Sequence, residues 1–297
     1  MKPLLLALFD SVHLAPEIQA QCDAELGDLE LRLFPDGETY VRINSEVKNR
    51  RIILVASLNQ PNEKLVSLLW VAETARVLGA KEVGLIAPYL AYMRQDKQFN
   101  PGEGITSKYF ARLLSQYFNW LITVDPHLHR YSSLGEIYSI PSVVLHASAA
   151  IADWIKNHIK NPLIIGPDQE SKQWVAEISQ KAAAPYIVLE KIRKDDRHVE
   201  VVLPAIEQYK DCMPVLVDDI ISTARTMIET IQHLKNAHMK LPICIGIHAV
   251  FSGNAYDALL KAGAQKILTC NTIAHVSNAI DLAPVMGKAV LGYLLGE

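Results

Sequence analysis

Short apolar runs alternate with runs of helical periodicity along most of this chain, and that alternation limits the folds open to it. Strand-sized apolar runs occupy residues 4–9, 29–34, 52–56, 83–87, 120–124, 163–166, 186–189, 215–217, 243–250 and 266–268. Helical periodicity occupies residues 16–26, 62–78, 107–117, 147–157, 170–183, 227–238 and 255–262. Strands that alternate with helices in this way are typical of parallel sheets covered by helices, so we predict an α/β fold.

The length of the chain, 297 residues, is enough for two domains. No low-complexity linker separates them, and the least periodic segment after the first strands is 134–142. We therefore expect two closely packed α/β halves, residues 1–141 and 142–297. The residues that follow Gly79 and Gly263 are similar to each other, which hints at a duplication, and both glycines suit helix C-caps.

The composition excludes several classes of function. A formal net charge of −3 provides no basic surface for nucleic acid, and the longest apolar runs are far too short to span a membrane. The first residues show no signal-peptide pattern, and the four cysteines form no Cys-x-x-Cys pair. We predict a cytoplasmic protein that binds neither nucleic acid nor membrane.

The most informative segment begins at residue 215. An apolar run at 215–217 precedes Asp218 and Asp219, and a hydroxyl-rich turn then leads into an amphipathic helix. Ligands of open parallel sheets bind at the carboxyl ends of strands, and a turn before a helix directs main-chain N–H groups at an anion. A phosphate site beside two carboxylates that accept sugar hydroxyls fits a sugar phosphate, above all ribose 5-phosphate. The same residues also fit a plain helix cap, with Ser222 or Thr223 as N-cap.

Polar residues follow two further expected strands. Residues 89–97 include Arg94, whose rigid fork of donors suits phosphate, although an ordinary charged loop is the alternative. A single histidine at this place is more often structural than a ligand, but His127 and His129 together with the nearby Asp125 raise the odds of a metal or phosphate role. Further ligands for a zinc site are lacking.

Three more segments have a simple structural interpretation. Residues 33–43 contain a Pro-Asp-Gly turn between β-type residues, which predicts a hairpin. Asp168 lies in a turn between an expected strand and an expected helix. Residues 189–197 carry dense mixed charge, which on its own is typical of a solvated loop.

In their order and spacing, over roughly residues 34–272, these segments resemble the ribose-phosphate pyrophosphokinase family. The resemblance rests on Phe34-Pro35-Asp36-Gly37-Glu38, Tyr92-Met93-Arg94-Gln95-Asp96, Asp125-Pro126-His127, Pro167-Asp168, Glu190-Lys191-Ile192-Arg193, Asp218-Asp219-Ile220-Ile221-Ser222-Thr223 and His248-Ala249-Val250-Phe251-Ser252-Gly253. It implies two tandem type I phosphoribosyltransferase-like domains, each a mostly parallel sheet covered by helices. The phosphoribosyl pyrophosphate (PRPP) loop would lie in the second domain. A homo-oligomer, based on a dimer, is also implied.

The resemblance implies roles for individual residues. ATP would bind to Phe34, Asp36, Glu38, Arg94, Gln95 and Asp96. Ribose 5-phosphate would bind to Asp218, Asp219, Ser222, Thr223, Ala224, Arg225 and Thr226. Lys191 and Arg193 would be catalytic residues on a mobile loop, and Mg²⁺ would bind near His127 and Asp168. The implied reaction transfers the β,γ-pyrophosphoryl group of Mg²⁺–ATP to the 1-hydroxyl of ribose 5-phosphate, giving PRPP and AMP.

Two departures from the family pattern keep other functions open. Arg225 stands where the family most often has Gly, and could either crowd the loop or contact a phosphate. Glu170 and Ser171 replace two glycines. A non-catalytic regulatory paralogue and a pyrophosphokinase with another sugar phosphate or nucleotide donor are therefore alternatives. A phosphoribosyltransferase is a third, but it would not need the segments 34–38 and 94–96.

Overall fold

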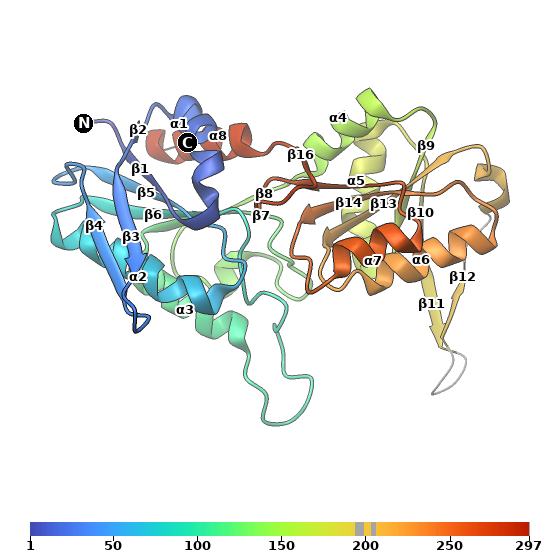
Figure 1. Cartoon of the computed structure of the whole chain (residues 1–297), viewed down its shortest axis with the longest axis horizontal. Coiled ribbons are helices and arrows are strands. Elements are labelled where there is room, and N and C mark those ends of the chain that lie inside the picture. Colours follow the sequence, from blue (N-terminus) through green and yellow to red (C-terminus); the bar gives the residue numbers. More distant parts are fainter. Residues whose placement is uncertain (194–198, 203–205, 297) are drawn as a thin grey trace. The chain divides into compact units, whose positions relative to one another are not determined.

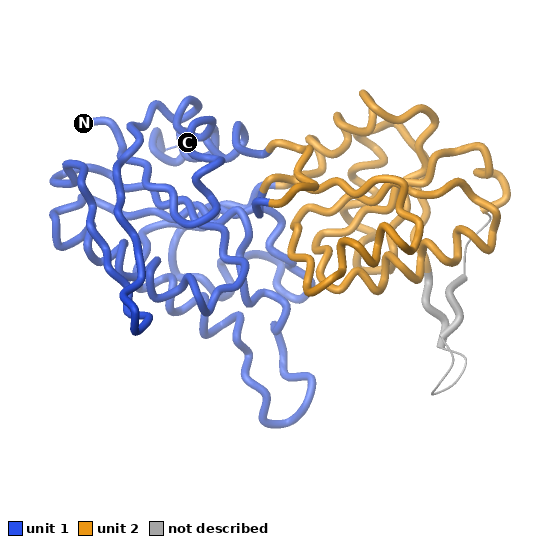
Figure 2. The backbone as a smooth tube through the Cα atoms, viewed as in Figure 1, with its two compact units in different colours: residues 1–145, 272–274, 282–297 blue, residues 146–271, 275–281 orange. Residues whose placement is uncertain are grey.

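The computed structural model describes residues 1–193, 199–202 and 206–296, without the side chains of 190–193 and 199–202. The chain forms two compact units (Figure 2). The first unit consists of residues 1–145, 272–274 and 282–297, and the second of residues 146–271 and 275–281.

The first unit is built on a six-stranded parallel sheet with the order β2-β1-β5-β6-β7-β8. Its strands are β1 (Leu4–Ala7), β2 (Glu25–Leu26), β5 (Arg51–Val55), β6 (Glu82–Ala87), β7 (Trp120–Val124) and β8 (Ser142–Leu145). Helices α1 (Ala15–Cys22) and α8 (Ala283–Leu295) cover one face, and α2 (Pro61–Val77) and α3 (Thr106–Tyr117) cover the other (Figure 1). An antiparallel hairpin, β3 (Leu29–Leu33) and β4 (Thr39–Ile43), packs beside α2, and the short 3-10 helices are η1 (Phe9–Leu14) and η2 (Leu134–Glu136).

The second unit repeats this arrangement with the strand order β10-β9-β13-β14-β15-β16, again parallel. Its strands are β9 (Pro162–Gly166), β10 (Tyr186–Val188), β13 (Met213–Ile220), β14 (Ile243–His248), β15 (Lys266–Cys270) and β16 (Asn278–Ile280). Its helices are α4 (Ser148–His158), α5 (Lys172–Ala182), α6 (Arg225–Asn236), α7 (Ala255–Ala262) and the 3-10 helices η3 (Gln169–Ser171) and η4 (Ile206–Tyr209). A separate antiparallel hairpin joins β11 (Glu190–Arg193) to β12 (Val199–Val202).

The central strands explain why the sequence shows unbroken apolar runs. All of β7 is buried, and so is every residue of β5 after Arg51. Strands of a parallel sheet are covered by helices on both faces. Successive side chains point to opposite faces, and they are apolar on both. The predicted α/β fold with helix-covered parallel sheets is confirmed.

Most expected elements are present with shifted ends, and one helix is missing from the prediction. The helix expected to reach residue 26 ends at Cys22, because Asp23 adopts a left-handed conformation with φ 49° and the chain turns into β2. Helix α8 was not expected because its sequence, with two glycines and apolar residues on all sides, shows no polar face.

The two units differ from the predicted division into residues 1–141 and 142–297. The first unit extends to Leu145, and it also includes α8 from the end of the chain. Helix α8 packs closely against α1, because Gly287 has no side chain: a methyl group there would lie 2.5 Å from Cβ of Gln21 and 2.8 Å from the carbonyl oxygen of Ile18.

The helices and the cysteines each have one further feature. Among the described residues, none of the helices has the length and apolar character needed to cross a lipid bilayer. The four cysteines are all buried and form no disulfide, as expected for small hydrophobic core residues.

Candidate active site

Two adjacent carboxylates lie near the carboxyl end of β13, in the middle of the second sheet. Asp219 is only 5% exposed, and its main-chain amide donates a hydrogen bond of 3.0 Å to the carboxylate of Asp218. Burial raises the pKa of the Asp218 carboxyl well above its usual range, and the negative charges of Asp219 and Asp168 raise it further. The position therefore favours a bound cation, or sugar hydroxyls that donate to these oxygens.

The turn after these carboxylates leads directly into α6. Ala224 is the N-cap of this helix, in a left-handed conformation with φ 59°, and no side chain caps it. The expected N-cap role of Ser222 or Thr223 is therefore wrong. Because no capping side chain occupies them, the first main-chain N–H groups of α6 are suited to an anion.

Neighbouring main-chain groups fix this turn in place. The amide of Ile221 donates to the carbonyl of His248 at 3.1 Å, and the amide of Phe251 donates to the carbonyl of Ile221 at 2.8 Å. The Ser252 amide donates to the Ser222 carbonyl at 3.0 Å, and the two serine hydroxyls lie 3.1 Å apart. The loop after β14 thus holds the turn in a fixed shape before any ligand arrives.

Arg225 does not distort the backbone of the turn. It is exposed and is the first residue of α6, and it is not among the residues with positive φ. The left-handed position is Ala224, one residue earlier, so the backbone at residue 225 does not require Gly.

Asp168 lies at the end of β9, in a turn that it stabilises itself. Its carboxylate accepts a hydrogen bond of 3.1 Å from the amide of Ser171, and the Ser171 hydroxyl donates to the Asp168 carbonyl at 2.6 Å. Ser171 is fully buried, so this replacement for a family glycine has a structural role. Carboxylate oxygens are preferred ligands of Mg²⁺, and the mutual repulsion of Asp168 and Asp218 is what a divalent cation would offset. The residues present therefore fit a magnesium ion.

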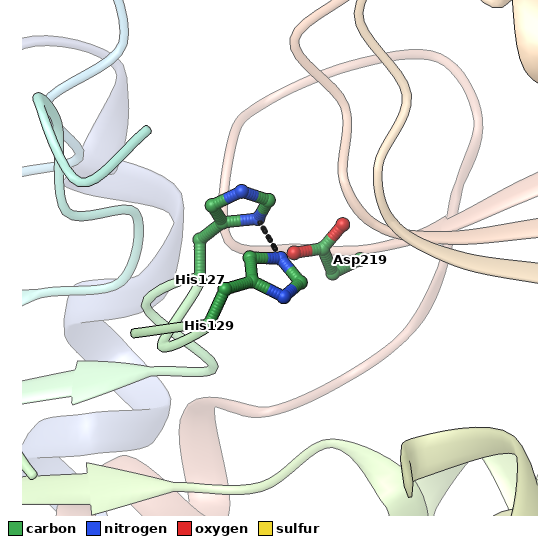
Figure 3. A group of neighbouring side chains, drawn as sticks. All are labelled: His127, His129 and Asp219. Atoms are coloured by element: carbon green, nitrogen blue, oxygen red, sulfur yellow. Dashed lines mark hydrogen bonds between the residues drawn. The ribbon is translucent and has the colours of Figure 1, made fainter. Parts of the chain in front are cut away.

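A pair of histidines follows β7 in the first unit. His129 Nε2 lies 3.0 Å from His127 Nδ1, and Figure 3 shows the hydrogen bond between the two rings. Asp125 and His127 both have positive φ, at 32° and 57°. Such backbone strain in non-glycine residues is concentrated at functional sites.

The segment with Arg94, Gln95 and Asp96 divides into exposed and buried residues. Arg94 is exposed, and Gln95 accepts a hydrogen bond of 3.1 Å from the Thr106 hydroxyl. The Asp96 side chain is 1% exposed and accepts hydrogen bonds of 2.8 and 3.0 Å from Arg130 Nη1. The structure therefore gives Asp96 a role in holding Arg130, while ATP binding by all three residues stays a prediction.

The hairpin predicted around Pro35-Asp36-Gly37 is confirmed as β3 and β4. The Asp36 carboxylate accepts a hydrogen bond of 3.2 Å from the Glu38 amide and so stabilises the turn. Phe34 is 40% exposed and meets Tyr40 edge to face, with 6.0 Å between ring centroids. The Arg32 guanidinium lies 4.9 Å from the centroid of Phe34. The exposed Phe34 ring is thus pre-oriented by its neighbours.

The predicted catalytic residues Lys191 and Arg193 lie on β11. Their backbone pairs with Val201 and Val199 of β12, so a strand replaces the solvated loop that composition alone suggested. Their side chains, and all of residues 194–198, lie outside the described part of the chain.

Known proteins resemble this chain in sequence over both of its units. The family model for the N-terminal domain of ribose phosphate pyrophosphokinase matches residues 4–117, and the family model for the phosphoribosyl transferase domain matches residues 133–283. A ribose-phosphate pyrophosphokinase of Methanopyrus kandleri is 31% identical over 97% of this chain and 98% of its own. One from Saccharolobus solfataricus is 34% identical over 82% of this chain and 84% of its own.

The chain belongs to the ribose-phosphate pyrophosphokinase family. Its fold agrees with that of phosphoribosylpyrophosphate synthetase from Mycobacterium smegmatis, with a TM-score of 0.87, 21% identity and full coverage of both chains. As a member of the ribose-phosphate pyrophosphokinase family it is an enzyme, a transferase of the kinase type.

Sequence reasoning missed two residues that this pyrophosphokinase uses to build its loops. Arg130 and Asp96 are 34 positions apart, and no periodicity or motif links them. Asn254 is the N-cap of α7, and Ser252 instead supports the turn at Ser222. The only signal in the sequence was that each residue follows the end of a strand.

Proposed function

We propose that this enzyme transfers the β,γ-pyrophosphoryl group of Mg²⁺–ATP to the 1-hydroxyl of ribose 5-phosphate, releasing AMP and PRPP. The observation that carries the proposal is the pair Asp218–Asp219 immediately before the fixed turn at the start of α6. At this place the two carboxylates can accept hydrogen bonds from sugar hydroxyls, and the neighbouring main-chain N–H groups can donate to a 5-phosphate. The family of the relatives supports the same reaction.

In this proposal the residues of the turn bind the sugar phosphate. The main chain of residues 222–226 and the Arg225 guanidinium bind the 5-phosphate, and Asp218 and Asp219 accept hydrogen bonds from the ribose hydroxyls. The turn is held by the loop after β14, so binding costs little reorganisation.

The nucleotide is bound by other groups. Phe34 stacks on the adenine, with Asp36 and Glu38 beside it, and Arg94 and Gln95 hold the phosphates. His127 and Asp168 are the proposed metal ligands, and Mg²⁺ supplies polarisation of the phosphate oxygens when bound. Lys191 and Arg193 neutralise charge as the 1-hydroxyl oxygen forms its bond to the β-phosphorus and AMP leaves. The bond between the β-phosphorus and the α-phosphate oxygen breaks as AMP leaves, and the proton of the 1-hydroxyl passes to solvent. Phosphoryl transfer depends mainly on positioning and electrostatics.

The first test measures AMP formed from ATP and Mg²⁺ with and without ribose 5-phosphate. We expect AMP that depends on the sugar, and its loss in Lys191→Ala. Lys181→Ala, on the exposed face of α5 beside Glu177, is the matched control and should keep full activity. AMP formation that ignores the sugar rejects the proposal. Nucleotide binding with no AMP favours the regulatory paralogue instead.

The same proposal includes a cytoplasmic homo-oligomer, based on a dimer. The four buried cysteines without disulfides agree with a cytoplasmic location, and the oligomer is carried over from the resemblance to the family. Sedimentation of the purified protein at several concentrations tests the oligomer, and a single species with the mass of one 33.1 kDa chain rejects it.

A further inference from the structure

A buried carboxylate and an exposed guanidinium form an ion pair next to the histidine pair of the first unit. Asp96 has a side-chain exposure of 1%, whereas its partner Arg130 is 41% exposed. One nitrogen of Arg130, Nη1, contacts both carboxylate oxygens, at 2.8 and 3.0 Å. Among the described residues, the other guanidinium nitrogens of Arg130 donate to no acceptor.

The buried end of this pair is fixed by further hydrogen bonds. The Tyr131 hydroxyl donates to the main-chain carbonyl of Asp96 at 3.1 Å and lies 3.1 Å from the hydroxyl of Ser107, which is fully buried. Asp96 therefore has a fixed main chain as well as a fixed carboxylate. A buried charge is costly unless it is paired, and the ion pair with Arg130 compensates for the burial of the Asp96 carboxylate.

The exposed end is supported by the loop between β6 and α3, which projects from the first unit in Figure 1. The ring of Phe99 lies with its centroid 5.5 Å from the Arg130 guanidinium carbon. The Glu103 carboxylate accepts hydrogen bonds from the amides of Phe99 and Asn100, at 2.8 and 3.0 Å, and from the Asn100 side chain at 2.6 Å. Arg130 thus lies between the fixed carboxylate of Asp96 and the ring of Phe99, a residue whose main-chain amide is held by Glu103.

We propose that Arg130 is a phosphate-binding residue for the nucleotide, and that Asp96 is its positioning residue. The inference rests on the proposed function for the identity of the ligand as ATP. Arg130 comes three residues after His127, and its side chain is 41% exposed, so a phosphate can reach the guanidinium. In a chain of net charge −3, a fixed local cation is what a polyphosphate requires.

The test is a calorimetric titration of the full chain with Mg²⁺–ATP and, separately, with ribose 5-phosphate. Arg130→Met should weaken ATP binding at least about tenfold, since a hydrogen bond to a charged group is lost, and should leave the sugar phosphate affinity unchanged. Arg130→Lys should retain part of the ATP affinity. Arg112→Met, which removes the same charge from the exposed face of α3, is the matched control and should bind like the wild type.

The Asp96→Asn variant separates positioning from folding. It should also weaken ATP binding, and the double variant with Arg130→Met should be no weaker than Arg130→Met alone, because both changes disable one group. ATP binding by Arg130→Met within twofold of the wild type overturns the inference, as does an equal loss for both ligands with a lowered Tm. If the wild type binds ATP but forms no sugar-dependent AMP, the proposed reaction is refuted. The titration with ATP then still tests whether Arg130 binds the phosphates of the nucleotide. A wild type that binds no ATP refutes the inference as well.

Discussion

The main-chain amide of Asp219 donates a hydrogen bond of 3.0 Å to the carboxylate of Asp218, at the buried end of β13. The pKa of Asp218 is nevertheless raised, first by burial and then by the charges of Asp219 and Asp168. One hydrogen bond from a neutral amide does not offset those effects. The unliganded site therefore stores electrostatic strain that a sugar phosphate with its cation would relieve.

We predict that Asp218→Asn stabilises the unliganded protein at neutral pH and weakens ribose 5-phosphate binding. Because the folded pKa lies above the unfolded one, the folded state binds more protons, and the free energy of unfolding falls as pH rises from about 4, near the usual Asp pKa. Asparagine carries no charge and removes that cost. Urea unfolding between pH 4 and pH 8 should show a difference from wild type that grows with pH.

The control for this prediction is Asp153→Asn, which changes an exposed carboxylate on α4. It should leave the pH dependence of unfolding close to that of the wild type. An Asp218→Asn protein that is less stable than the wild type at pH 7 would show that the carboxylate is stabilised by its surroundings.

The outcome at this site shows what sequence patterns specify and what they leave out. Asp218, Asp219 and Asp168 follow apolar runs that parallel sheets require, so their placement at strand ends could be predicted. Their mutual electrostatic effect could not, because residues 50 positions apart reach one another only through the folded sheet. The same holds for Asp96, for which the family resemblance implied a contact with ATP: its burial beside Arg130 could not be predicted, because the two residues are far apart in the sequence. Helix α8 escaped prediction for a different reason, since an apolar helix between two partners has no polar stripe.

Two neighbouring glycine substitutions in the turn before α6 should differ in their effect on stability. Ala224→Gly should stabilise the protein by about 1 kcal/mol, because a left-handed conformation costs an L-residue about that much and costs Gly almost nothing. Arg225→Gly should give no such gain, since residue 225 has no positive φ. Thermal unfolding of the two variants measures the difference.

Arg225→Gly also tests the proposed contact with the sugar phosphate. If the guanidinium binds the 5-phosphate, its removal should raise the KM for ribose 5-phosphate about tenfold or more while the KM for ATP stays the same. Ala224→Gly serves as the control for any general loosening of the turn. An unchanged or lower KM for ribose 5-phosphate in Arg225→Gly would exclude the contact.

Two glycines of α8 test how this helix is attached to the first unit. Gly287→Ala should destabilise the protein by about 1–3 kcal/mol, because the new methyl group would overlap Gln21 and the Ile18 carbonyl of α1. Gly292→Ala, in open space on the same helix, should be neutral or stabilise by up to about 1 kcal/mol through helix propensity. Denaturant unfolding of both variants decides the matter. Equal stabilisation by both substitutions would mean that α8 does not press against α1 in solution.

The exposed ring of Phe34 provides the last prediction. It is 40% exposed at the tip of the β3–β4 hairpin, where Tyr40 and Arg32 orient it. If it stacks on adenine, Phe34→Ala should raise the KM for ATP about tenfold, since an aromatic contact of this kind contributes about 1 kcal/mol beyond the area it buries. The KM for ribose 5-phosphate should not change.

The adjacent Leu33 is the matched control for Phe34, because it is 61% exposed on the same hairpin and its side chain points to the opposite face of the strand. Leu33→Ala should leave both KM values unchanged. A tenfold rise in the KM for ATP in both variants would mean that the hairpin as a whole had shifted. No rise in Phe34→Ala would mean that adenine binds elsewhere, because an exposed aromatic ring that contacts no ligand can be removed without effect on binding.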